Sequence, residues 1–129
     1  MSNKLFPKVT QIEGGASSVT TPEFEMTENS AVVFLISGHE TPLTVTATGY
    51  KDEGIEKAIG FETKALTGTD WTEVESDGVE ITAEDAFLVA VPAPFLAHDG
   101  LDRVALTIDG GTDSAAIFAF EIKSRYIPE

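Results

Sequence analysis

The apolar residues of this chain fall into short segments that end at glycine, proline or aspartate. The run Ala31–Ile36 (AVVFLI) is six residues long, is rich in β-branched side chains and is followed by Ser37-Gly38. Its length and composition favour a strand buried on both faces over a helix. A second run, Ala86–Val91 (AFLVAV), stops at Pro92. Segments of this kind restrict the chain to folds built largely from β-sheet.

Other segments alternate between apolar and polar residues. In Leu43–Thr48 (LTVTAT), apolar residues on one face alternate with threonines on the other, as expected for a half-buried strand. Trp71–Glu75 and Val79–Ala83 flank an Asp77-Gly78 pair, which supplies left-handed turn residues. This pattern predicts a β-hairpin.

The last apolar segments also predict a hairpin. Arg103–Ile108 alternates, Asp109–Asp113 forms a turn, and Ala115–Ile122 returns. The period of two places Ile117 and Ala119 on one face of the final strand and Phe118, Phe120 and Ile122 on the other.

Two stretches are candidates for helix. Residues 50–60 place Ile55 and Ile59 four apart and Glu53 four before Lys57, which predicts either a helical turn or an irregular connection. Residues 93–98 predict one helical turn. About seven to nine short strands and little helix predict an all-β, antiparallel β-sandwich of jelly-roll or immunoglobulin-like type. Its predicted core residues are Val32, Phe34, Val45, Val89, Leu106, Ile117 and either Phe118 or Phe120.

A chain of 129 residues predicts a single folded domain. We expect residues 1–22 to form an extended N-terminal arm and residues 23–129 to form the sandwich, because Gly14-Gly15 and Thr21-Pro22 interrupt any longer segment. The arm is too apolar for a free tail, so it is expected to pack on its own domain or on a neighbour. We predict that residues 1–13 contact another subunit, with Lys4 and Lys8 facing acids there. The predicted contact residues of the arm are Lys4, Leu5, Phe6, Lys8, Val9 and Ile12.

Net charge narrows the possible partners. The chain has 22 acidic and 8 basic residues and a formal net charge of −14, so it should repel nucleic acid and anionic membranes. Residues 65–102 contain acids but neither lysine nor arginine. Two interpretations follow: a solvated acidic surface, or an acidic outer face with less acidic ends that contact a partner.

Two further features of the sequence concern cysteine-based cross-links and the cellular compartment. Cysteine is absent, which excludes disulfides and cysteine-ligated zinc. No apolar run approaches the roughly 18 residues of a membrane span, and the N-terminus has no secretory apolar region, so we expect synthesis in a cytosol.

Candidate metal and catalytic residues are few. Asp109 and Asp113 offer oxygen ligands for calcium, but the EF-hand spacing is absent and a hairpin turn explains both. His39 and His98 lack a zinc-binding motif and are interpreted as polar loop residues. Paired carboxylates such as Glu84-Asp85 suit a glycosidase, but abundant surface acids also explain them. We therefore expect no enzyme activity, no catalytic residue, no cofactor and no required metal.

Three aromatic residues leave a second function open. Trp71, Tyr50 and Tyr126 are candidates for a platform on which a sugar ring stacks, as in a lectin-like sandwich. The alternative interpretation places Trp71 in ordinary core or rim packing. A carbohydrate-binding module is accordingly the alternative function.

Several stretches together resemble a known class of protein. They are KLFPKVTQIEGG, AVVFLISGHETPLTVTATG, FLVAVPAPFLAHDGLDRVALTI and AAIFAFEIKSRYIP. The chain resembles the small β-sandwich virion proteins encoded beside tailed-phage capsid genes. This resemblance implies a non-enzymatic capsid decoration or accessory protein, made in the host cytoplasm and located in the virion. Its implied partners are capsid or other virion subunits, with the chain present as a homo-oligomer or bound to a lattice.

Overall fold

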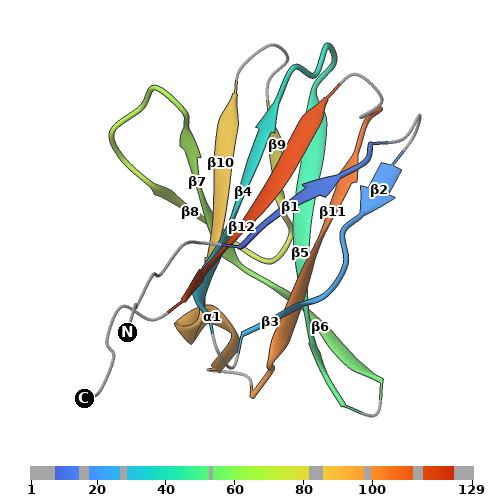
Figure 1. Ribbon diagram of the computed structural model, residues 1–129, viewed down its shortest axis with the longest axis vertical. Helices are drawn as coiled ribbons and strands as arrows, with labels where there is room; N and C mark the ends of the chain where they lie inside the picture. The colour runs from blue at the N-terminus through green and yellow to red at the C-terminus, as the bar shows by residue number, and fades with distance from the viewer. Residues whose placement is uncertain are drawn as a thin grey trace.

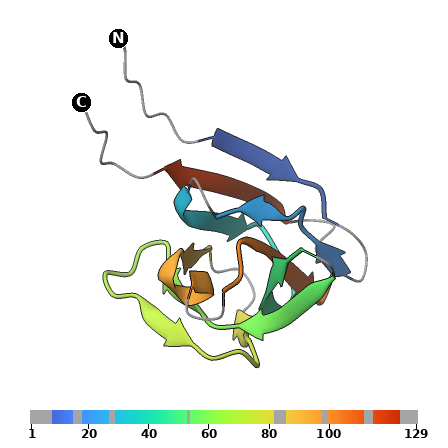
Figure 2. The same cartoon turned by 90° about the horizontal axis from the view of Figure 1, so that it is seen from below.

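The computed structural model describes residues 8–14, 18–26, 29–52, 54–81, 86–97, 100–111 and 115–123. Most of these residues lie in strands, which form two sheets of antiparallel pairs. The strands run roughly vertically in Figure 1, and the view from below in Figure 2 shows the two sheets stacked as layers. The predicted all-β antiparallel sandwich is confirmed.

The layer that faces the viewer in Figure 1, called sheet A, has six strands in the order β1-β12-β4-β10-β7-β8. Strands β4 and β10 come from the two uninterrupted apolar runs and lie at its centre, whereas β1 and β8 form its edges. The strand bounds are β1 (Lys8–Ile12), β12 (Ala116–Lys123), β4 (Asn29–Ser37), β10 (Phe87–Pro92), β7 (Phe61–Ala65) and β8 (Thr72–Val74).

The second layer, called sheet B, follows the order β2-β11-β5-β6, with β3 also pairing with β11 and β9 also pairing with β5. A single helical turn, α1 (Pro94–Ala97), follows β10 as predicted. The strand bounds are β2 (Ser18–Thr20), β11 (Arg103–Asp109), β5 (Leu43–Lys51), β6 (Ile55–Ile59), β3 (Phe24–Glu25) and β9 (Val79–Ile81).

The core lies between the sheets and is filled by alternate residues of each strand. On β4, Val32, Phe34 and Ile36 have no exposed surface, while the residues between them are half-buried on the opposite face. Phe24 of sheet B meets Phe34 of sheet A edge to face, with ring centroids 5.6 Å apart. Six predicted core residues are confirmed as fully buried: Val32, Phe34, Val45, Val89, Leu106 and Ile117.

The seventh core residue was predicted to be either Phe118 or Phe120, and this prediction is wrong. Ala119 is fully buried beside Ile117, whereas Phe118 and Phe120 are half-buried on the outer face of sheet A. Because neighbouring residues of a strand point to opposite faces, Ile117 in the core excludes both phenylalanines from it.

The strands of both predicted hairpins are present, but in neither case do the two strands pair with each other. β11 pairs within sheet B, while β12 pairs within sheet A. β8 likewise pairs with β7 in sheet A, and β9 pairs with β5 in sheet B. Both turns therefore cross from one layer to the other. A sandwich uses such crossings to cover a strand's buried face with the opposite sheet.

The interpretation of residues 50–60 was also wrong. β5 and β6 form a hairpin here, in which Tyr50 faces Glu56 and Ala47 faces Ile59. A separation of four residues fits one face of a helix, but it also fits one face of a strand, whose period is two. In the strand, Ile59 is buried and Ile55 is exposed.

The boundary predicted at residue 22 does not separate an arm from the sandwich in the described residues. β1 pairs with β12 in sheet A, and β2 pairs with β11 in sheet B. Ile12 faces Ile117 across the first pair and belongs to the core. Lys4, Leu5 and Phe6 lie outside the described residues.

Candidate partner-binding surfaces

The described part of the predicted arm forms an edge of the sandwich. β1 is the last strand of sheet A and pairs on one side only among the described strands, with β12. Val9 is 52% exposed on it, while Ile12 is buried in the core. Edge strands present backbone N–H and C=O groups that another strand can pair with. β1 is therefore a candidate site for strand addition.

A charged hollow adjoins this edge. The Lys8 Nζ atom lies 4.0 Å from Glu121 Oε2, and the Glu121 side chain is only 12% exposed. Lys8 therefore has an acidic neighbour within its own chain, whereas an acid on a partner was predicted. The hollow beside this pair has a volume of about 340 Å³ and is lined by Lys8, Thr10, Pro22, Glu23, Phe24, Glu25 and Glu121.

The face of sheet A that points away from the core, called the apolar face, is uncharged across four adjacent strands. The strand register aligns its side chains in three rows over β1, β12, β4 and β10, and the first charged residues beside the rows are Glu62 and Lys64 on β7. The rows are Gln11, Phe118, Leu35 and Leu88; then Val9, Phe120, Val33 and Ala90; then Ile122, Ala31 and Pro92.

The sequence carried a signal for this face. We predicted Ala31–Ile36 and Ala86–Val91 to be buried on both faces, but most of their outward side chains are only half-buried. The inward residues pack in the core, so the outward ones form an apolar surface on the other side of the same strands. Uninterrupted apolar runs in an antiparallel sandwich are unusual where the outer face meets water alone.

The outer face of sheet B is different in chemistry. Thr44, Thr46 and Thr48 alternate along β5 with the buried Leu43, Val45 and Ala47, as predicted. Across the sheet, Thr107 faces Thr46 on one side and Thr20 on the other. The molecule thus has one apolar and one hydroxyl-rich outer face.

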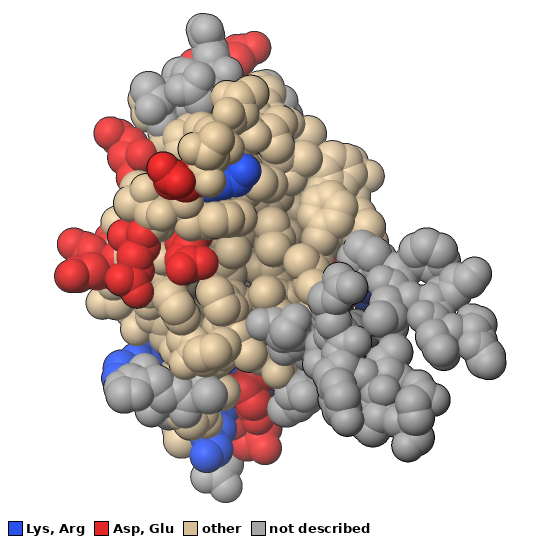
Figure 3. Space-filling model, turned by 90° about the vertical axis from the view of Figure 1, so that its left-hand side faces the viewer, with Lys and Arg blue, Asp and Glu red and all other residues tan. Residues whose placement is uncertain are grey.

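Acidic side chains are unevenly distributed over the surface. Figure 3 shows them mainly at the left of the view, which is the side of sheet B, and below. The surface toward the right, on the side of sheet A, is mostly uncharged where it is described.

Arg103 organises a cluster of acids at one end of sheet B. Its guanidinium lies 3.0 Å from Glu23, 3.2 Å from Asp102 and 3.4 Å from Asp52. The hydrogen bond to Asp102, together with the charges of Glu23 and Asp52, raises the pKa of Arg103 further above its usual value. The cluster joins β11 to the segments before β3 and after β5. Its cation is already surrounded by carboxylates.

Tyr50 lies opposite Arg103 in the sheet. Burial, then the charges of Glu56 and Glu23, raises the pKa of its hydroxyl. Tyr126, its predicted partner in a sugar-binding platform, lies outside the described residues. Tyr50 lies on β5 of sheet B, whereas Trp71 directly precedes β8 of sheet A. These two residues therefore do not form the predicted platform.

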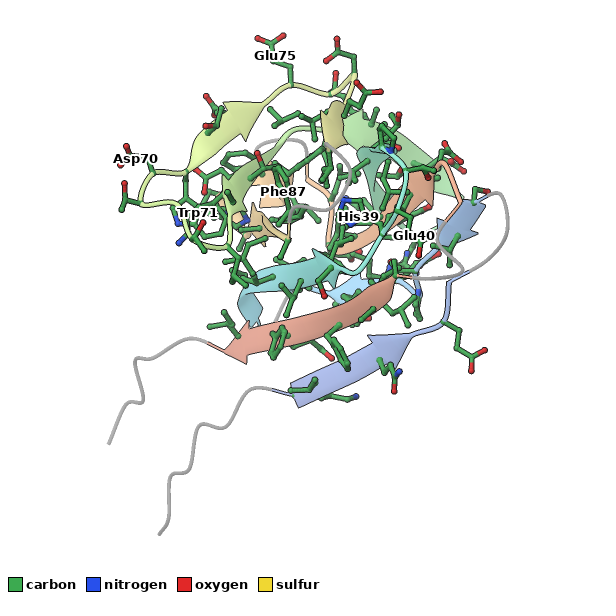
Figure 4. All side chains as sticks on the ribbon, turned by 90° about the horizontal axis from the view of Figure 1, so that it is seen from above. His39, Glu40, Asp70, Trp71, Glu75 and Phe87 are labelled. Carbon is green, nitrogen blue, oxygen red and sulfur yellow. The ribbon has the colours of Figure 1, made fainter. Side chains whose placement is uncertain are left out.

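Trp71 itself is accessible. It precedes β8 and is 42% exposed, and Figure 4 shows it with Asp70 at the margin of the sandwich. The Lys64 Nζ atom lies 5.8 Å from the centre of its ring and donates a hydrogen bond to the Gly68 carbonyl oxygen. One side of the ring therefore already has a cationic neighbour. A nearby open hollow of about 400 Å³ is lined by Gly60, Glu73, Val74, Glu75, Ser76, Pro94 and Phe95, without Trp71.

The remaining candidates do not converge on one site. His39 lies in the loop that joins β4 to β5, as predicted, but its side chain is buried, while Glu40 points outward (Figure 4). Asp109 ends β11 and is exposed. The residues His98, Asp113, Glu84 and Asp85 lie outside the described part of the chain. Within that part, no three acidic or histidine side chains are grouped to hold a metal ion.

Comparison with known proteins finds a solved structure of similar fold. No protein-family model matches the chain, and no curated protein sequence matches it. Its fold is similar to the crystal structure of the SPBc2 prophage-derived protein YomS, with a TM-score of 0.62 and 15% sequence identity. The match covers 95% of this chain and 100% of the other, so the similarity spans the whole sandwich. Among the described residues, no helix has the length and apolar character to cross a membrane.

Proposed function

We propose that this chain is a non-enzymatic structural protein of a phage virion, which docks on an assembled shell as a decoration or accessory protein. The observation that carries the proposal is β1, an edge strand whose Lys8 and Val9 are exposed and whose outer side has no partner strand among the described residues. The likeness to a prophage-derived protein of the same fold supports a phage origin.

An edge strand suits docking on a repeated surface. A strand from a shell subunit can pair with the backbone of β1, and side chains such as Val9 then select the partner. Each such contact is weak by itself, but many copies on a lattice add through multivalency. Lys4, Leu5 and Phe6 precede β1 in the sequence, and the proposal keeps them as predicted contacts.

The test is cosedimentation of the purified chain with shells assembled from the capsid protein that is encoded beside it. The intact chain should sediment with shells at a fixed, saturable ratio. Deleting residues 1–7, which leaves β1 in place, should reduce retention about tenfold or more, as loss of several small contacts predicts. Val9→Asp should act in the same direction, because a charge would be buried at the contact.

A matched control is available on the other sheet. Ile55 on β6 is 50% exposed, nearly as much as Val9, so Ile55→Asp makes the same chemical change away from β1. Retention of this variant should equal that of the intact chain. Undiminished binding after both the deletion and Val9→Asp would refute docking through β1.

Exposure of Trp71 supports carbohydrate binding as a second candidate function. It is the single tryptophan of the chain, so its fluorescence reports on this position alone. Titration with oligosaccharides should then change the emission saturably, and Trp71→Ala should abolish binding heat in calorimetry. Constant emission over a broad panel of neutral and acidic glycans would remove this candidate.

A further inference from the structure

We propose that the apolar face of sheet A packs against the same face of a second copy of this chain, forming a two-fold dimer. The face is defined above by three rows of side chains over β1, β12, β4 and β10. This inference deepens the proposed function, because such a dimer would present two β1 edges to a repeated surface.

The residue composition of the apolar face resembles that of a protein–protein interface. Phe118 lies beside Leu35, which lies beside Leu88 on the next strand, so three large apolar side chains form a continuous row, and Phe120 lies in the row next to it. Ile122 and Val9, at the margins, are 36% and 52% exposed. On the β7 side, Glu62 and Lys64 are the first charged residues beside the described rows. An uncharged centre with a charged margin is the usual composition of a protein interface.

The charge distribution of the chain indicates which partner covers the apolar face. At a net charge of −14, two copies repel each other at most orientations. A basic partner would be drawn to the acids shown in Figure 3, and it would find no carboxylate to pair with in the rows of the apolar face. Face-to-face packing of two copies leaves no charge buried in the rows and directs the acids of sheet B away from the contact. A two-fold axis makes the surface complementary to itself.

Size predicts the strength of the contact. Strands lie about 4.8 Å apart and rise about 3.3 Å per residue, so the rows cover roughly 15–20 Å in each direction. An area on the order of 300–400 Å² is about half of the roughly 800 Å² per partner in a complex of standard size. The dimer should therefore be reversible and should dissociate on dilution.

Sedimentation velocity of the full chain over a wide concentration range tests the proposal. The intact chain should shift from monomer to dimer as concentration rises, and added sodium chloride should strengthen the dimer because it screens acid–acid repulsion. Phe120→Glu enters the interface twice in a two-fold dimer, so the dissociation constant should rise more than tenfold. Leu88→Asn, which keeps the length and branching of the side chain, provides a second variant and should also weaken the dimer.

Thr46→Glu supplies the matched control. It also adds a carboxylate, but on β5, on the outer face of sheet B. Its dissociation constant should stay that of the intact chain, and circular dichroism should show all variants folded. A chain that remains monomeric at millimolar concentration overturns the proposal. So does a dimer that survives both apolar-face variants, or one that Thr46→Glu weakens equally. A chain that dimerises but does not bind shells would instead refute the proposed function and leave the dimer standing.

Discussion

Gly78 illustrates what a single residue decides in this fold. Its backbone has φ of +91°, and a Cβ added there would lie 2.6 Å from the Val45 carbonyl oxygen and from Thr46 Cγ2. The Asp77-Gly78 pair correctly predicted a left-handed residue at Gly78. The close approach of β5 was not predictable, because it depends on β9 joining sheet B.

Gly78→Ala should therefore destabilise the chain more than a left-handed alanine does on its own. Gly54 has φ of +79° with no atom within 4 Å of an added Cβ, so Gly54→Ala isolates the backbone effect of roughly 1–2 kcal/mol. The contact with Val45 should make the Gly78→Ala loss clearly larger. Urea unfolding of both variants measures the difference, and equal losses would contradict the packing described here.

At the scale of elements, the strands were predictable and their partners were not. Apolar alternation in Arg103–Ile108 correctly indicated which residues point inward, and in Ala115–Ile122 it separated the two faces, although the core was wrongly expected to include Phe118 or Phe120. Periodicity reports only the direction of side chains relative to the core. A turn that returns within one sheet and a turn that crosses to the other sheet leave the same pattern, because both place apolar residues toward the same core.

The N-terminal segment shows the same limit with a functional consequence. Its apolar residues were attributed to a partner, but Ile12 completes the core of its own sandwich through pairing of β1 with β12. Lys8 and Val9 keep their exposure and remain candidates for docking. Part of the candidate site was thus predictable from composition, whereas the apolar face required the assembled sheet.

Deleting residues 1–13 should lower stability as well as docking. The deletion removes β1, exposes the edge of β12 and uncovers the core beside Ile117. Loss of a buried isoleucine alone is worth about 2–5 kcal/mol. Deleting residues 1–7 should leave the melting temperature nearly unchanged, because β1 and Ile12 are retained. Equal melting temperatures for both deletions would show that β1 contributes little to the fold.

For the whole molecule, the net charge of −14 acts against the compact state. The ion pairs of Arg103 oppose this repulsion, but their side chains are partly exposed, so water and salt screen them. Repulsion among 22 acids should therefore dominate. Salt should stabilise the fold as the screening length falls from about 10 Å at 0.1 M to about 3 Å at 1 M.

Two charge reversals on and beside β8 separate this global repulsion from a local one. Glu73→Lys and Glu75→Lys each change the net charge from −14 to −12, since −14 + 2 = −12. Glu73 lies directly opposite Glu62 on β7, and like charges at such positions are destabilising. Both variants should unfold at higher urea concentration in low salt, and Glu73→Lys should gain about 0.2–1 kcal/mol more. Salt should reduce both gains, because screening weakens all of these exposed charges. If neither reversal stabilises the chain at low salt, self-repulsion does not limit its stability, and the charge argument for the orientation of the dimer loses its basis.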